Sequence, residues 1–184
     1  MKAPQFALSF VFAGSALLAG CQTTSHSDMS PTVVKAATPA EKAALLEQVK
    51  KLAGTWEMKD DKGNTMTAAV FTVSSNGSAV REVMMPGTDH EMTNMYTMDG
   101  DALLMTHYCA MGNQPHMKAH AGPKPNVIKF ETAGVSNLND ANGLYMAEMT
   151  MTIVDNDHIT AEWTHIQNAK RDQHTTPFEM TRKK

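Results

Sequence analysis

Histidine, cysteine and methionine residues gather in the middle of the chain, and their side chains can bind metals or take part in catalysis. The densest stretch, residues 106–116, contains His107 and Cys109, and His90 and Met92 lie shortly before it. Imidazole, thiolate and thioether groups are ligands of copper and zinc. A thiolate beside an imidazole is also a nucleophile. The sequence therefore offers a soft-metal site or a reactive cysteine, if the fold brings these groups together.

A turn at Asp99-Gly100 predicts how the strand that carries His90 and Met92 pairs with the strand that carries His107 and Cys109. With these residues as a two-residue β-turn, the opposing pairs are Tyr96–Leu103, Asn94–Met105, Met92–His107 and His90–Cys109. These eight residues share the more apolar side of the predicted sheet, so we expect them to point inward. The candidate metal ligands are His90, Met92, His107 and Cys109.

A second hairpin adds an apolar wall. A three-residue loop at residues 155–157 predicts the pairs Ile153–Ile159, Met151–Ala161, Met149–Trp163 and Ala147–His165. The opposite side carries threonine and glutamate, as a solvated face should. His165 is therefore a further histidine that we expect to point inward.

The sequence does not settle which side chains point inward on the two strands that flank Asn76-Gly77. A turn at these residues would place Glu82 on the same side as Val73 and Val80. Carboxylates are rarely buried among apolar side chains, so the facing of this strand pair stays open.

The elements that position these residues are one helix followed by many strands. Thr38-Pro39-Ala40-Glu41 is typical of a capped helix start, and Leu45, Leu46, Val49 and Leu52 recur at helical spacing. This pattern predicts one amphipathic helix over about Pro39 to Ala53, with Gly54 able to end it. The remaining sequence alternates strand-like runs with turn residues. It predicts a mainly β protein with an antiparallel, up-and-down barrel of eight to ten strands.

Two stretches carry family resemblances. Gly54-Thr55-Trp56, at the start of the first strand, resembles the Gly-x-Trp opening of lipocalins and related calycins, whose tryptophan plugs the barrel floor. The region from Pro86 to His116 resembles uncharacterised exported bacterial proteins of a calycin-like type. The resemblance implies a calycin-like barrel and brings no known activity with it.

The amino terminus resembles a bacterial lipoprotein signal. Lys2 is followed by an apolar run, residues 6–18, that is too short to span a bilayer, and then by Leu17-Leu18-Ala19-Gly20-Cys21. The resemblance implies that Cys21 carries palmitate-type acyl chains and anchors the protein to a membrane of the cell envelope. Gln22 implies the outer membrane, facing the periplasm, if the cell is Gram-negative.

We thus expect three segments: a leader (1–20), a lipidated cysteine with a flexible tether (21–37), and one helix-plus-barrel domain (38–184). The formal net charge of −3 argues against a nucleic-acid partner. The only cysteines are Cys21 and Cys109, so lipidation leaves Cys109 as a free thiol.

Three interpretations of the inward residues stay open. We favour a cup for a small apolar or amphipathic ligand, which suits the interior of such a barrel. Its lining residues are Trp56, Tyr96, Met105, His107, Cys109, Met149, Trp163 and His165. The alternatives are a copper or zinc site and an enzyme with a Cys109 nucleophile activated by His107 or His90. No oxyanion or orienting-acid motif accompanies Cys109, so binding is favoured over catalysis.

Overall fold

The computed structural model describes residues 33–172 and 176–184. The predicted leader, Cys21 and most of the predicted tether lie outside these residues. Val34–Lys184 forms one compact unit that contains the whole hydrophobic core described below. A unit with its own core is expected to fold without the preceding segment. None of the helices described is long and apolar enough to cross a bilayer.

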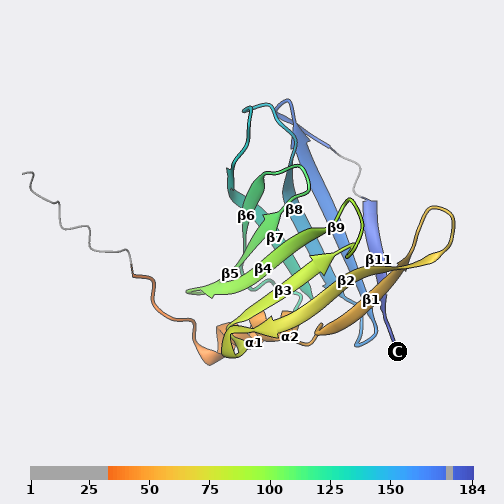
Figure 1. Cartoon of the computed structure of the whole chain (residues 1–184). Coiled ribbons are helices and arrows are strands. Elements are labelled where there is room, and N and C mark those ends of the chain that lie inside the picture. The colour runs from red at the N-terminus through yellow and green to blue at the C-terminus, as the bar shows by residue number, and fades with distance from the viewer. Residues whose placement is uncertain (1–32, 173–175) are drawn as a thin grey trace, which may run out of the picture. The chain divides into compact units, whose positions relative to one another are not determined.

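Ten antiparallel strands of the described chain close into an up-and-down barrel, as the sequence predicted (Figure 1). They are β1 (Gly54–Lys59), β2 (Thr65–Ser74), β3 (Ala79–Met84), β4 (Met92–Asp99), β5 (Ala102–Tyr108), β6 (Gln114–Ala119), β7 (Val127–Ser136), β8 (Tyr145–Ile153), β9 (His158–Gln167) and β11 (Thr176–Arg182). Pairing of β8 with β9 closes the barrel, because β9 also leads through β11 back to β1. Two short elements are outside this ring: β10 (Lys170–Arg171), which pairs with β9, and η1 (Ser75–Gly77) in the β2–β3 turn.

The predicted single helix is two helices, α1 (Pro39–Ala44) and α2 (Leu46–Lys50). The capping box is present, with the Thr38 hydroxyl 3.3 Å from the Glu41 amide and a Glu41 carboxylate oxygen 2.6 Å from the Thr38 amide. The helix breaks at Leu45, where φ is −125° and ψ is −82°. Leu45, at the break, and Leu46, the first residue of α2, are both buried.

Trp56 and Arg182 close the end of the barrel beside α2. Trp56 is fully buried, and its indole Nε1 donates to the carbonyl of Leu52 at 2.8 Å. The Arg182 guanidinium carbon lies 4.4 Å above the indole ring. Arg182 also donates to the carbonyls of Ala53 and Lys51, at 2.8 and 2.9 Å. The strand end, the helix end and the carboxy-terminal strand are thus joined at one point.

The hairpin between β4 and β5 has a different register from the predicted one. Its two-residue turn is Gly100-Asp101, so Asp99 opposes Ala102 and Asn94 opposes His107. Gly100 has φ +63° at the first central turn position, where type II′ turns require glycine. The shift is two residues, which keeps the residues that pair in this hairpin on their predicted faces. The individual predicted pairs, including Met92–His107 and His90–Cys109, are wrong.

The hairpin between β8 and β9 confirms the predicted pairs through Met149–Trp163. The last predicted pair, Ala147–His165, is wrong because a β-bulge leaves Ala147 without an opposing residue. Met146 opposes His165 instead. A bulge adds one residue to one strand and changes the pairing beyond it.

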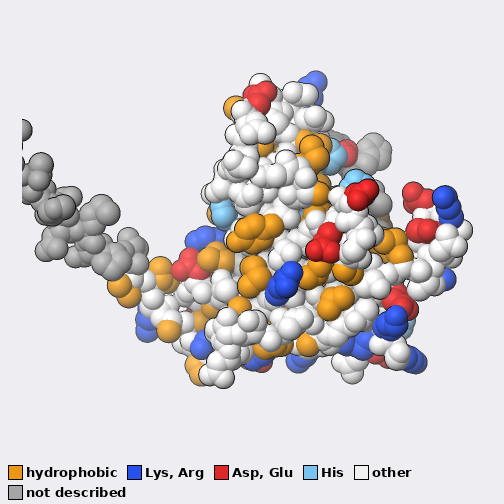
Figure 2. All heavy atoms as spheres, in the orientation of Figure 1, with side chains coloured by type: hydrophobic (Ala, Val, Ile, Leu, Met, Phe, Trp, Pro, Cys, Tyr) orange, Lys and Arg blue, Asp and Glu red, His pale blue; other side chains and the backbone are white. Residues whose placement is uncertain are grey.

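Charged side chains of both signs are interspersed on the face shown in Figure 2, and hydrophobic side chains lie scattered among them. The larger apolar side chains pack inside the barrel instead. The buried set includes Trp56, Phe71, Tyr96, Met105, Phe130, Met149 and Trp163.

Candidate functional site

Four polar side chains form a connected chain inside this apolar core. Glu82, Asn94, Tyr96 and His107 have at most 4% of their surface exposed. The amide nitrogen of Asn94 donates to Glu82 Oε2 at 2.7 Å, and the Tyr96 hydroxyl donates to the same oxygen at 2.5 Å. His107 Nδ1 lies 2.7 Å from the amide oxygen of Asn94. Adjacent strands β3, β4 and β5 supply the four residues.

These contacts determine the tautomer of His107. Since the Asn94 amide nitrogen faces Glu82, its oxygen faces the imidazole and accepts a hydrogen bond from Nδ1–H. Burial lowers the pKa of His107 from 6.5 to about 4, so the ring is neutral at pH 7. Its Nε2 therefore carries a free lone pair. That lone pair can accept a hydrogen bond or bind a metal.

Glu82 and Tyr96 have their protonation states shifted by the same burial. Burial raises the pKa of Glu82, although the hydrogen bonds from Tyr96 and Asn94 act in the opposite direction. Burial, together with the neighbouring Glu82 charge, raises the pKa of Tyr96 well above its ordinary value. Tyr96 is thus a fixed donor. Oε1 of Glu82 accepts no hydrogen bond from any described residue.

Two buried polar atoms beside this chain have no partner among the described residues: His107 Nε2 and Trp163 Nε1. The two rings pack together, with centroids 4.9 Å apart and planes tilted by 46°. A buried polar group without a partner costs about 1–3 kcal/mol. The pair offers one acceptor and one donor that a bound molecule could satisfy.

A small cavity lies next to Glu82 and Trp163. Its volume is about 10 Å³, which is room for roughly one water molecule. The described lining residues are Ala68, Glu82, Met84, Met85, Met149, Met151, Ala161, Trp163, Phe178 and Met180. The cavity exists because two of these positions are alanines, whose side chains cannot fill the space between the longer ones.

A larger groove outside the barrel wall meets this cavity. It encloses about 600 Å³ and shares two lining residues with the cavity, Met85 and Phe178. Both are half-buried. The barrel wall is incomplete here, because β1 and β11 pair at only two positions, Trp56–Arg182 and Glu57–Thr181. Met85 and Phe178 therefore separate the interior cavity from the surface groove.

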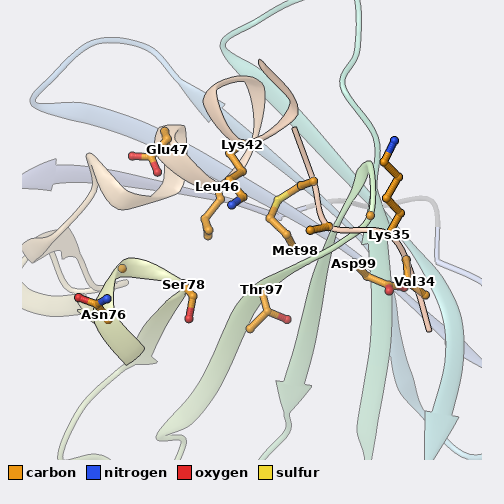
Figure 3. Close-up of a pocket in the computed structure, with 14 residues that line it drawn as sticks. Val34, Lys35, Lys42, Leu46, Glu47, Asn76, Ser78, Thr97, Met98 and Asp99 are labelled. Atoms are coloured by element: carbon orange, nitrogen blue, oxygen red, sulfur yellow. The ribbon is translucent and has the colours of Figure 1, made fainter. Parts of the chain in front are cut away.

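A third hollow lies on the outside of the barrel, between the helices and the β4–β5 turn (Figure 3). It encloses about 510 Å³ and is lined partly by Val34 and Lys35, just before α1. Its two carboxylates are already paired, Glu47 with Lys50 at 2.8 Å and Asp99 with Lys118 at 3.1 Å. This groove has no buried polar atom without a partner among the described residues. It is a weaker candidate than the interior.

No protein-family model matches this chain, and no curated protein matches it. The site is therefore interpreted from its own chemistry. The described residues include no group of three or more His, Cys, Asp or Glu side chains that could hold a metal ion.

The structure buries most of the predicted lining residues. Those inside the barrel are Trp56, Tyr96, Met105, His107, Met149 and Trp163. Cys109 is half-buried in the turn that follows β5. The imidazole of His165 is half-buried near the end of β9, 3.5 Å from Asp172.

The predicted metal set is not brought together. His107 is buried, whereas His90 is exposed on the loop before β4 and lines the surface groove. Met92 is the first residue of β4, and Cys109 lies beyond the end of β5. The expected alignment fails because pairing between β4 and β5 ends at Thr93–Tyr108. The strands do not extend as far as the sequence prediction required.

Three features were not predicted from the sequence: the burial of Glu82, the cavity-lining role of the methionines other than Met149, and the hydrogen-bonding role of Asn94. The sequence did contain a signal for Glu82, since it alternates with Val80 and Met84 on one strand. Both neighbours are buried, and Glu82 opposes buried Phe71 on β2. Alternation outweighed the general preference of carboxylates for the surface, because Asn94 and Tyr96 supply donors.

Proposed function

We propose that this chain is a lipid-anchored protein of the bacterial cell envelope whose barrel binds a small apolar or amphipathic molecule in its interior. One observation carries the binding proposal. His107 Nε2 and Trp163 Nε1 are both buried without a partner among the described residues, on two rings whose centroids lie 4.9 Å apart. Small-molecule sites combine apolar walls with a few polar groups that orient the ligand.

The two atoms favour a ligand with a hydroxyl group at its polar end. Trp163 Nε1 is a donor, and the free lone pair of His107 Nε2 is an acceptor. A hydroxyl can accept from the indole and donate to the imidazole at the same time. The rest of the ligand would contact methionine and aromatic side chains.

Room for such a ligand requires movement of the cavity wall. The cavity of about 10 Å³ is far smaller than the roughly 300–1,000 Å³ of typical ligand sites. Rotation of Met85 and Phe178 would join it to the groove of about 600 Å³. Methionine side chains are flexible and adapt readily to new neighbours. The gap between β1 and β11 supplies the route.

The calycin-like assignment is part of the proposal. It is supported by Gly54-Thr55-Trp56 at the start of β1 and by the burial of Trp56 beside α2, where a calycin tryptophan plugs the barrel floor. The lipid anchor is supported by the Leu-Ala-Gly-Cys pattern that ends at Cys21. A cysteine-dependent enzyme has less support, because no described hydrogen bond joins the Cys109 thiol to a histidine.

Displacement of a fluorescent apolar dye from the fragment 34–184 tests the binding proposal. We expect 1-decanol to displace the dye, and its methyl ether to compete less well because it cannot donate to His107 Nε2. Trp163→Phe removes the indole donor. It should lower the affinity of both the alcohol and the ether by about 2–10-fold, which corresponds to the loss of one hydrogen bond. Met111→Leu, at a position 64% exposed, is the control. Equal displacement from the Trp163→Phe protein would contradict the proposal.

A further inference from the structure

Methionines supply half of the described residues that line the interior cavity. Among the described lining residues, five of ten are methionines: Met84, Met85, Met149, Met151 and Met180. Thioether sulfur is a soft ligand, which selects Cu(I) over harder ions such as Mg²⁺ and Ca²⁺. The cavity volume of about 10 Å³ suits a single ion or water molecule, without movement of the wall.

We infer that this cavity is a binding site for one monovalent soft metal ion, Cu(I), held by methionine sulfurs. The inference rests on the proposed function in one respect, that the barrel interior binds a small ligand. It names an occupant for the closed barrel, whereas an organic ligand requires the wall to open. The residues differ from the histidine and cysteine set predicted from the sequence.

The strand registers place the methionines around a common space. Met151 on β8 and Phe178 on β11 both oppose Ala161 of β9, one from each side. Met149 opposes Trp163, and Met180 opposes Ile159. Because the Ala161 side chain is one methyl group, it leaves space between Met151 and Phe178, and Met149 and Met180 line the same space.

Met84 on β3 lines the same cavity and contacts the polar chain. Its sulfur lies 3.4 Å from the amide nitrogen of Asn94, and Met84 also opposes Ala69 on β2. Glu82 precedes it by two residues on the same face of β3. Thioether groups from β3, β8 and β11 therefore surround a cavity that also contains one carboxyl group.

Two further cavity-lining residues suit a cation of single charge. A buried positive charge needs a compensating negative charge, and Glu82 supplies one carboxylate whose Oε1 accepts no hydrogen bond from the described residues. Trp163 presents an aromatic ring, which attracts cations through its π-face. A single carboxylate balances Cu(I) fully and a divalent ion only partly. This charge balance favours the monovalent ion.

Methyl NMR of the fragment 34–184 tests the inference directly. The fragment carries Cys109→Ser, so that no thiol competes for the metal, and its methionine methyl groups are labelled with ¹³C. The titrants are Ag(I), a stable soft monovalent ion, and Cu(I) under anaerobic reducing conditions. We expect one equivalent of either ion to shift the resonances of Met149, Met151 and Met180 and to leave exposed Met111 unchanged. Shifts confined to Met111 and other exposed methionines would overturn the inference.

Leucine substitutions remove the sulfur and preserve most of the packing volume. Loss of partners outside the ligand set commonly weakens metal affinity by about 10–100-fold, so losing a ligand should weaken it by at least about tenfold. We expect this from Met149→Leu, Met151→Leu and Met180→Leu, measured by competition with a Cu(I) chelator. Met111→Leu is the matched control. Unchanged affinity in all three cavity variants would overturn the inference, and three positions guard against one variant failing to fold.

A decanol titration of the same labelled protein separates this inference from the proposed function. If decanol shifts the cavity methionines and neither metal ion does, Cu(I) is the wrong occupant and interior binding stands. If neither the alcohol nor the ions shift them, both proposals fail. If the ions alone shift them, the cavity is a metal site and the organic ligand is excluded.

Discussion

His107 Nδ1 lies 2.7 Å from the amide oxygen of Asn94. This contact leaves the other imidazole nitrogen, Nε2, buried and with a free lone pair. Asn94 in turn donates to Glu82. One amide thus fixes the imidazole tautomer and supports the buried carboxyl group. The site depends on this amide more than on any other single polar group.

Asn94→Ala should destabilise the fold strongly. The substitution leaves His107 Nδ1 without an acceptor and removes one of the two donors to Glu82 Oε2. Each buried group that loses its partner costs about 1–3 kcal/mol, so we expect a loss of about 2–4 kcal/mol in the free energy of unfolding. Urea denaturation measures it. Asn142→Ala, at an exposed position, is the control and should change little. Similar midpoints for the two variants would contradict the importance of the network.

The free energy of unfolding should depend on the protonation of His107. The imidazole pKa is about 4 in the folded protein and near its ordinary 6.5 in the unfolded chain. Between these values the unfolded chain binds a proton that the folded protein does not. Stability from this group is therefore complete above pH 6.5 and falls as the pH decreases toward 4, by up to about 3 kcal/mol.

Comparison with His107→Gln isolates this dependence. Glutamine can still donate to Asn94, and it does not titrate. Protonation of Glu82 changes the free energy of unfolding in the opposite direction, because its raised pKa favours the folded state at low pH. This contribution is the same in both proteins. We expect the wild-type protein to lose more stability than the variant between pH 7 and pH 4. Parallel curves of urea midpoint against pH would show that His107 is not held neutral by burial.

Arg182→Lys should weaken the closed end of the barrel. Lysine keeps the positive charge, but it lacks the planar group that lies 4.4 Å above Trp56 and reaches the carbonyls of Ala53 and Lys51. We expect a loss of about 1–3 kcal/mol, seen as a lower midpoint of thermal unfolding. Arg81→Lys, on the exposed side of β3, is the matched control. A melting temperature equal to that of the control would argue against a stabilising role.

Cys21→Ser should abolish lipid modification in cells. Under the proposed lipid anchor, Cys21 at the end of the Leu-Ala-Gly-Cys pattern is the acceptor of the acyl chains. We expect the wild-type chain and Cys109→Ser to incorporate radiolabelled palmitate, and Cys21→Ser to incorporate none. Labelling of the Cys21→Ser chain would rule out the lipoprotein assignment.

The side chains that face the barrel interior could be predicted from sequence, because their alternation along a strand does not depend on the exact register between strands. The β4–β5 register is shifted by two residues, yet Asn94, Tyr96 and His107 point inward as expected. The shift follows from the backbone at Gly100, which occupies the first turn position. Two-residue turn signals do not say which two residues are central.

The polar chain could not be predicted because its members depend on partners from three strands. Glu82 is buried only because Tyr96 and Asn94 reach its carboxyl group. The cavity likewise depends on alanines and methionines that meet across separate hairpins. Such arrangements follow from tertiary packing, which no single strand pattern contains.

Native mass spectrometry of the full-length protein, purified from the cells that naturally produce it, tests interior binding most directly. We expect a population with the added mass of one organic molecule or one Cu(I) ion. That population should be depleted in Trp163→Phe or in Met149→Leu, according to the occupant, and unchanged in Met111→Leu. Protein without such an added mass, or an added mass equally abundant in all four proteins, would contradict the claim that the barrel interior is a binding site.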